Sequence, residues 1–153
     1  MVVTTSLNIY YLPKLSEIKD NSELKKEIFS GYKIILPIVS ILALGIYTFR
    51  ELVIEIAFTE KFIPMLELFK WQLIGDVIKI ASWLLATLMV AKAMTKVFIV
   101  TEVIFSISFV VLSILFIDNI GLVGLTYAFS LNYFFYLIVM IFMFRKRFRK
   151  RFR

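Results

Sequence analysis

Four long stretches of apolar residues divide the chain, with charged or polar segments between them. They cover about Tyr32–Phe49, Trp71–Ala91, Val97–Ile117 and Leu122–Phe144. A helix rises about 1.5 Å per residue, so roughly 20 residues cross the ~30 Å hydrocarbon core of a bilayer. The pattern therefore predicts an all-α fold, a polytopic integral membrane protein with about four full transmembrane helices. Residues 1–13 are interpreted as the remnant of a truncated transmembrane helix.

The polar segments organise the rest of the chain. Residues 14–31 are predicted to form a cytoplasmic linker, whose second half, Ser22–Ser30, is either an interfacial helix or an extension of the first span. Residues 32–144 then form the four-span transmembrane part, and residues 145–153 form a basic cytoplasmic tail. Within the transmembrane part, Arg50–Lys70 is predicted to be an interfacial helix–loop–helix.

Lysine and arginine residues predict the orientation of the spans. One side of the membrane carries Lys14, Lys19, Lys25, Lys26, Lys33, Lys92, Lys96 and the tail RKRFRKRFR, whereas the other carries Arg50, Lys61 and Lys70. Cytoplasmic loops have an excess of basic residues, so the C-terminus is expected in the cytoplasm and the turn Asp118–Gly121 outside. The tail is expected to bind anionic membrane lipids as a surface anchor; a regulatory or partner-binding role is the alternative.

Composition narrows the classes of function. The chain is 61% hydrophobic with a mean hydropathy of +0.90, well above an ordinary soluble domain. It contains neither Cys nor His, which excludes disulfides, thiolate metal sites and catalysis by a histidine base. No phosphate-binding loop of the type GxxxxGK[ST] is present. We therefore expect no enzyme activity, no metal and no cofactor. The net charge of +7 is concentrated in the tail and does not indicate a nucleic-acid partner.

The second span carries charged residues on one helical face. Asp76, Lys79, Trp83 and Thr87 follow offsets of 0, 3, 7 and 11, which form a single stripe. Charges inside a membrane are costly and mark functional sites, so this face is predicted to line an aqueous cavity with Lys79 available to an anionic group. Two alternatives stay open: Asp76 and Lys79 neutralise each other, or they snorkel to the outer surface.

The third span has a second polar face, formed by Glu102, Ser106 and Ser113. Glu102 is predicted to bind a proton or cation, or to pair with a base on another helix. The alternative is that Glu102 snorkels toward the cytoplasm beside Lys92 and Lys96.

Small and aromatic residues characterise the fourth span. Gly121, Gly124 and Ala128 are spaced for close helix packing. The run YFFY at residues 133–136 is interpreted as lipid contact. Tyr136 also lies one turn after Asn132, and this pair is expected to face inward or toward another helix.

Four stretches, in this order, resemble the C-terminal part of the O-antigen and enterobacterial common antigen flippases: NIYYLPKLSEIKD, GYKIILPIVSILALGIYTFRELVIEIAFTEKF, WQLIGDVIKIASWLLATLMVAK and IGLVGLTYAFSLNY. Those flippases form the polysaccharide transporter branch of the multidrug/oligosaccharidyl-lipid/polysaccharide exporter superfamily. The resemblance covers nearly the whole chain. Its most specific pieces are Leu12-Pro13 at the end of a span, the proline-bearing span with an acidic end, and WQLIGD with the lysine and tryptophan that follow.

The resemblance implies transport of an undecaprenyl-pyrophosphate-linked oligosaccharide, an O-antigen or related polysaccharide unit, across the bacterial inner (plasma) membrane. It also implies that Lys79 and Trp83 contact this cargo, and that Asp76 and Glu102 take part in ion coupling. Family members have two lobes of spans, of which this chain resembles only the end. We therefore expect a fragment that is inactive alone and needs the missing N-terminal lobe or a partner chain.

A different class of function is a small four-span membrane scaffold or accessory subunit. That hypothesis treats the chain as complete and predicts that it accumulates stably without any longer product. A membrane glycosyl- or acyltransferase is the third class, and the absence of His and of a clustered acidic motif disfavours it.

Overall fold

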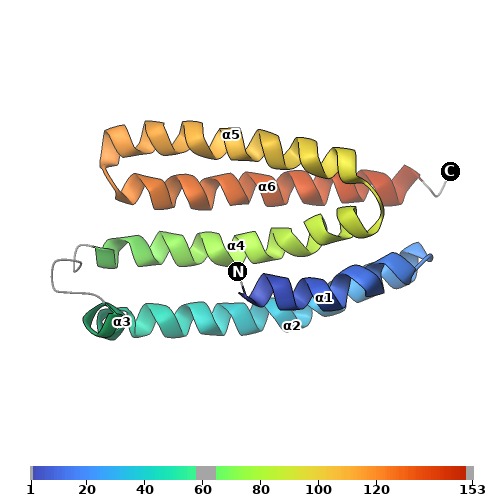
Figure 1. The fold of residues 1–153 in the computed structure, drawn as a ribbon, viewed down its shortest axis with the longest axis horizontal. Coiled ribbons are helices and arrows are strands. Elements are labelled where there is room, and N and C mark those ends of the chain that lie inside the picture. The colour runs from blue at the N-terminus through green and yellow to red at the C-terminus, as the bar shows by residue number, and fades with distance from the viewer. Residues whose placement is uncertain (1, 58–64, 151–153) are drawn as a thin grey trace.

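The computed structural model describes residues 2–57 and 65–150, and the side chains of 9–56 and 65–145. This part contains no strand. Its six helices are α1 (Val2–Glu17), α2 (Asn21–Thr48), α3 (Arg50–Ala57), α4 (Leu66–Ala91), α5 (Thr95–Ile120) and α6 (Val123–Lys150) (Figure 1). Four of them, α2, α4, α5 and α6, are long and apolar enough to cross a membrane. The predicted all-α, polytopic membrane fold is therefore confirmed.

The long helices extend beyond the apolar stretches that identify them. Helix α4 ends at Ala91 as predicted but begins at Leu66, before Trp71. Backbone hydrogen bonding continues where hydropathy falls, because a helix satisfies its own N–H and C=O groups in lipid and at the interface alike. For the same reason α2 begins at Asn21. Ser22–Ser30 thus extends the first span, the second of the two predicted alternatives.

Asp20 is the N-cap residue of α2 and lies just before its first residue, Asn21. Its carboxylate accepts hydrogen bonds from the backbone N–H groups of Ser22 and Glu23, both at 3.1 Å, and from the Ser22 hydroxyl. These are the donors that the first turn of a helix leaves without partners. The Ser22 hydroxyl and the backbone amides hold the pKa of the Asp20 carboxyl below its usual range, because they stabilise the charged form.

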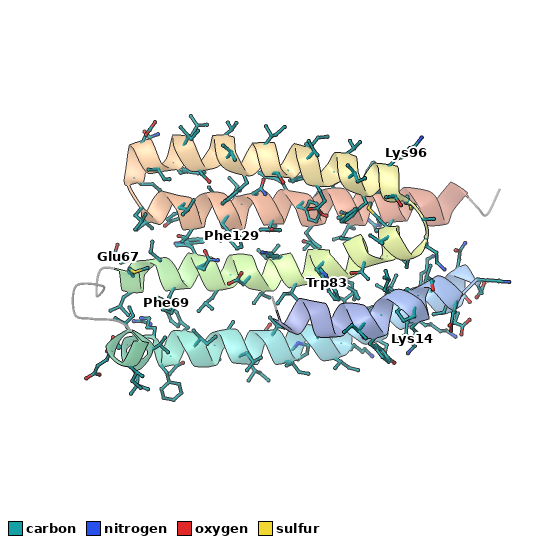
Figure 2. All side chains as sticks on the ribbon, in the orientation of Figure 1. Lys14, Glu67, Phe69, Trp83, Lys96 and Phe129 are labelled. Atoms are coloured by element: carbon teal, nitrogen blue, oxygen red, sulfur yellow. The ribbon has the colours of Figure 1, made fainter. Side chains whose placement is uncertain are left out.

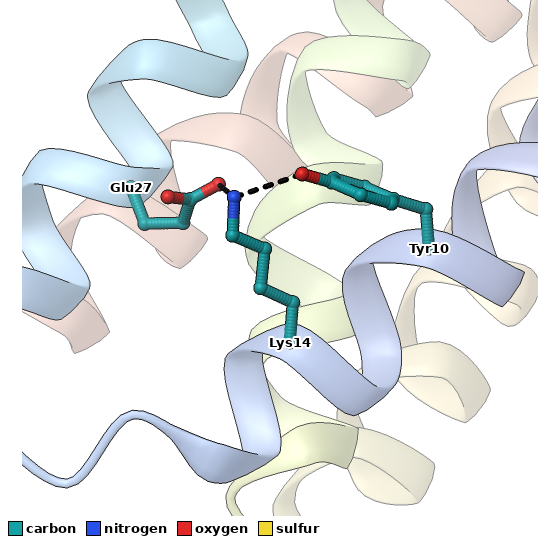
Figure 3. A network of polar contacts seen from close by, with 3 residues as sticks. All are labelled: Tyr10, Lys14 and Glu27. Atoms are coloured by element: carbon teal, nitrogen blue, oxygen red, sulfur yellow. Dashed lines mark hydrogen bonds and ion pairs between the residues drawn. The ribbon is translucent and has the colours of Figure 1, made fainter.

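Helix α1 is fixed against α2 by a polar contact near the end where the two helices connect. Figure 3 shows the Lys14 ammonium between two partners. Lys14 Nζ lies 2.7 Å from Glu27 Oε1 of α2 and donates a hydrogen bond of 2.8 Å to Tyr10 Oη of α1. Beneath this contact Leu15 is fully buried. Helix α1 continues through Pro13 to Glu17.

Helix α4 occupies the centre of the bundle. It lies between α1 and α2 on one side and α5 and α6 on the other (Figure 1). Its buried residues, among them Leu84, Leu88 and Met89, form the core together with residues of α1, α2 and α6. Helix α5 instead presents a nearly continuous apolar surface to its surroundings, as expected for a helix in contact with lipid.

The two ends of the bundle differ in charge. Lys96 lies at the end where α4 connects to α5 and where α1 connects to α2, and Glu67 lies at the opposite end (Figure 2). Lys33 is further along α2, but its Nζ lies over the ring of Phe29, one turn earlier. Its side chain therefore reaches back toward the Lys96 end. Helix α3 is seen nearly end-on at the Glu67 end and crosses the direction of the long helices (Figure 1).

Candidate functional site

A cavity of about 370 Å³ lies among α1, α4, α5 and α6. Its polar or amphipathic lining comes from three helices: Lys79, Trp83 and Thr87 of α4, Glu102 of α5, and Tyr133 and Tyr136 of α6. Apolar residues complete the wall, including Leu12 of α1 and Phe98 of α5. Three of the four predicted site residues, Lys79, Trp83 and Glu102, therefore lie around one space.

Lys79 is near the middle of α4, which runs from Leu66 to Ala91. Its Nζ lies 5.4 Å from the ring centre of Phe129 and 5.2 Å from that of Tyr133, both on α6. The negative faces of aromatic rings attract an ammonium group at such distances. Among the residues whose side chains the structure describes, no carboxylate lies within 4.0 Å of Lys79. The cation is thus held by aromatic rings and stays available to an anion.

Asp76 lies outside the cavity lining. It is one turn before Lys79 on α4, yet the ion pairs found in the described part of the chain do not include these two residues. Asp76 and Lys79 therefore make no ion pair within 4.0 Å in the described part of the chain, and Asp76 does not line the cavity that the other three candidates share.

Glu102 is paired with a tyrosine. The buried Tyr136 of α6 donates a hydrogen bond of 2.5 Å from its Oη to Glu102 Oε1. The Tyr136 ring is fixed in turn by an edge-on contact with Phe105, with ring centres 4.9 Å apart. A position beside Lys92 and Lys96 was one of the two sequence-based alternatives for Glu102, whereas the partner that the structure gives its carboxylate is the Tyr136 hydroxyl. The hydrogen bond directs the carboxylate toward the cavity.

The run YFFY divides into two pairs with different surroundings. Tyr133 and Tyr136 line the cavity, whereas Phe134 and Phe135 are 48% and 50% exposed on the outside of the bundle. The two phenylalanines are therefore placed where the predicted lipid contact is possible, whereas the two tyrosines are turned toward the cavity. Helical geometry supplies the reason, since residues three apart share a face that the two intervening residues do not.

The site offers a cation, a carboxylate and aromatic rings, a combination suited to binding a charged ligand. No group of three or more acidic, His or Cys side chains suited to a metal ion occurs in the described part of the chain. Small-molecule sites are mostly apolar, with a few polar groups that orient the ligand. This cavity matches that description and would accept a ligand that carries an anionic group.

Two curated proteins, from Escherichia coli (strain K12) and Shigella flexneri, are similar to this chain, and each is named Lipid III flippase. Each is 33% identical over 101 residues, which are 66% of this chain and 24% of the relative. The chain thus spans about a quarter of the length of the curated relatives it matches. No family model matches the chain, and no solved structure matches it. The similarity supports a relationship to membrane flippases; the O-antigen cargo stays a prediction.

Proposed function

We propose that this chain is part of a flippase that moves an undecaprenyl-pyrophosphate-linked oligosaccharide across a bacterial inner membrane. In this proposal Lys79 binds the pyrophosphate and Trp83 packs against the headgroup. The observation that carries it is the position of the Lys79 ammonium, which lines the cavity over two aromatic rings without a carboxylate within 4.0 Å among the described side chains.

The energetics of the membrane support a ligand for Lys79. A lysine at the centre of a transmembrane helix costs about 2.5–3.5 kcal/mol on insertion scales. Cation–π contacts recover about 0.5–2 kcal/mol. A doubly charged phosphate group would compensate the remainder by charge-assisted hydrogen bonds, which are about twice as strong as neutral ones. An anionic cargo explains why the charge is placed there.

We propose further that the chain works together with other transmembrane segments, in the same polypeptide or in a partner chain. Glu102 is exposed on α5, and a carboxylate in contact with lipid is costly. Additional helices would cover that side of the cavity. Within such an assembly, ion coupling remains the predicted role of Asp76 and Glu102, and anionic lipids remain the predicted partners of the basic tail.

A binding measurement tests the role of Lys79. The chain has two tryptophans, and only Trp83 lines the cavity, so a Trp71→Phe variant reports on this site by fluorescence. In lipid nanodiscs we would titrate this variant with undecaprenyl pyrophosphate. We expect saturable quenching, at least tenfold weaker affinity after Lys79→Ala, and an intermediate affinity after Lys79→Arg, because a guanidinium also binds phosphate.

Lys96→Ala is the matched control, because Lys96 is an exposed lysine outside the cavity. It should leave the affinity unchanged. Inorganic pyrophosphate should compete with the lipid if the charged group is what the site recognises. Equal affinity in the parent, Lys79→Ala and Lys79→Arg chains would contradict the proposal.

A further inference from the structure

Glu102 and Tyr136 form a polar pair on the cavity wall that binding of a pyrophosphate does not require. The hydrogen bond from Tyr136 Oη uses Glu102 Oε1. In the described part of the chain the other carboxylate oxygen has no hydrogen-bond partner, and Lys79 is not within 4.0 Å of it. A carboxylate has about four lone-pair positions for donors. This pair therefore presents unused acceptor sites to the cavity.

The surroundings of this pair are aromatic. Trp83, Phe98 and Tyr133 line the same cavity as Glu102 and Tyr136. The face of an aromatic ring is electron-rich and packs well against the C–H groups of a sugar ring, while a carboxylate accepts hydrogen bonds from the sugar's hydroxyls. Together the rings and the carboxylate form a wall suited to a pyranose.

We propose that Glu102, oriented by Tyr136, binds the sugar directly attached to the pyrophosphate, an inference that rests on the proposed function of Lys79. Lys79 and Glu102 line one cavity but do not pair, so a ligand with an anionic end and a hydroxyl-bearing end fits between them. At about 370 Å³ the cavity is near the lower end of the roughly 300–1,000 Å³ typical of small-molecule sites. It therefore accommodates the pyrophosphate with one sugar, rather than a whole oligosaccharide.

A comparison of two ligands tests the sugar site independently of the proposed pyrophosphate site. Undecaprenyl pyrophosphate, and the same lipid carrying one N-acetylglucosamine, are titrated into the Trp71→Phe chain in nanodiscs without any ion gradient. The quantity of interest is the ratio of the two affinities. We expect the sugar to raise affinity about tenfold, since hydrogen bonds to a charged group are among the stronger ones. Glu102→Gln should reduce this ratio to near one, and Tyr136→Phe should reduce it in part.

Glu67→Gln is the matched control, because Glu67 is an exposed carboxylate at the opposite end of the bundle (Figure 2). It should leave the ratio at its parental value. Circular dichroism and gel filtration identify variants that fail to fold, and Glu102→Asp, which keeps the charge, should restore part of the ratio. A parental ratio of one, or a tenfold ratio that survives Glu102→Gln, would overturn the sugar site. Lipid binding that is independent of Lys79 would instead reject the proposed function.

Discussion

Lys79 illustrates how a single residue can be costly to the fold and useful to function. Its Nζ sits over Phe129 and Tyr133, near the middle of a helix that crosses the membrane. No carboxylate within 4.0 Å offsets the charge among the described side chains. Residues selected for binding often destabilise the protein that carries them. Lys79 should then lower the free energy of unfolding of the chain, whereas a lysine in a structural ion pair would raise it.

Replacing Lys79 by methionine should stabilise the chain while it removes the binding group. Methionine has a similar length and no charge, so the cost of the buried ammonium disappears and only the cation–π contacts are lost. We expect a net gain of about 1 kcal/mol, which corresponds to an increase of about 2–4 °C in the unfolding midpoint. Thermal unfolding followed by circular dichroism in detergent measures it. Lys96→Met, at an exposed position, should change little, and a lower midpoint for Lys79→Met would indicate a structural role.

The sequence could predict which residue types form the site, but only part of how they meet. The helical stripe correctly placed Lys79 and Trp83 on one face, because α-helical periodicity is regular. It could not exclude Asp76, since the same stripe contains it and only the packing of α1 and α6 decides which part of the face lines a cavity. The partnership of Tyr136 with Glu102 joins residues 34 positions apart, which no local pattern reports.

At the scale of helices, glycine determines how closely α5 and α6 approach. Gly124 is buried at the start of α6, where a Cβ atom would overlap the backbone of Phe116 in α5. The predicted close packing at this residue is thus observed. Gly75 of α4 allows a similarly close approach to the Phe129 ring of α6, and no spacing pattern in the sequence indicates this contact. Small residues permit such approaches in membranes, where helix association depends on packing.

Gly124→Ala should weaken the packing of α5 on α6. Backbone atoms cannot rotate away as a side chain does, so the two helices must separate, and overpacking of this kind costs about 1–3 kcal/mol. Gly45→Ala on α2 is the control, because nothing lies within 4 Å of the Cβ position there. It should be neutral or stabilising by up to about 1 kcal/mol, through the higher helix propensity of alanine. Unfolding midpoints of the two variants compare them directly, and equal midpoints would show that the junction adapts freely.

The ends of the helices were harder to predict than their existence. Hydropathy identified the four helices of the described residues that are long and apolar enough to cross a membrane, because about 20 apolar residues are a strong signal. The start of α2 instead depends on Asp20, whose side chain accepts from the first turn, and a single capping residue is a weak signal in a charged segment. Helix α3 lies within the segment predicted as an interfacial helix–loop–helix, and residues 58–64 of that segment lie outside the described residues.

At the scale of the whole molecule, charge asymmetry follows the folded arrangement of the helices. The connections after α1 and α4 lie at the same end of the bundle as the C-terminal end of α6 (Figure 1). The basic residues of these three segments, although far apart in the sequence, are therefore collected at one end. The positive-inside rule then predicts that this end faces the cytoplasm. The connections after α1 and α4 and the C-terminal end of α6 all support the same orientation, because they lie at this one end.

Single cysteines test that orientation, because the chain itself contains none. Thr95→Cys marks the basic end and Asn119→Cys the opposite end; both positions are exposed and uncharged, so the charge balance that sets orientation is preserved. In spheroplasts, a membrane-impermeant maleimide should label Asn119→Cys almost completely. It should label Thr95→Cys only after permeabilisation, and the parent chain not at all. Labelling of Thr95→Cys in intact spheroplasts would reverse the assigned orientation, and partial labelling of both variants would mean that the basic residues do not fix a single topology.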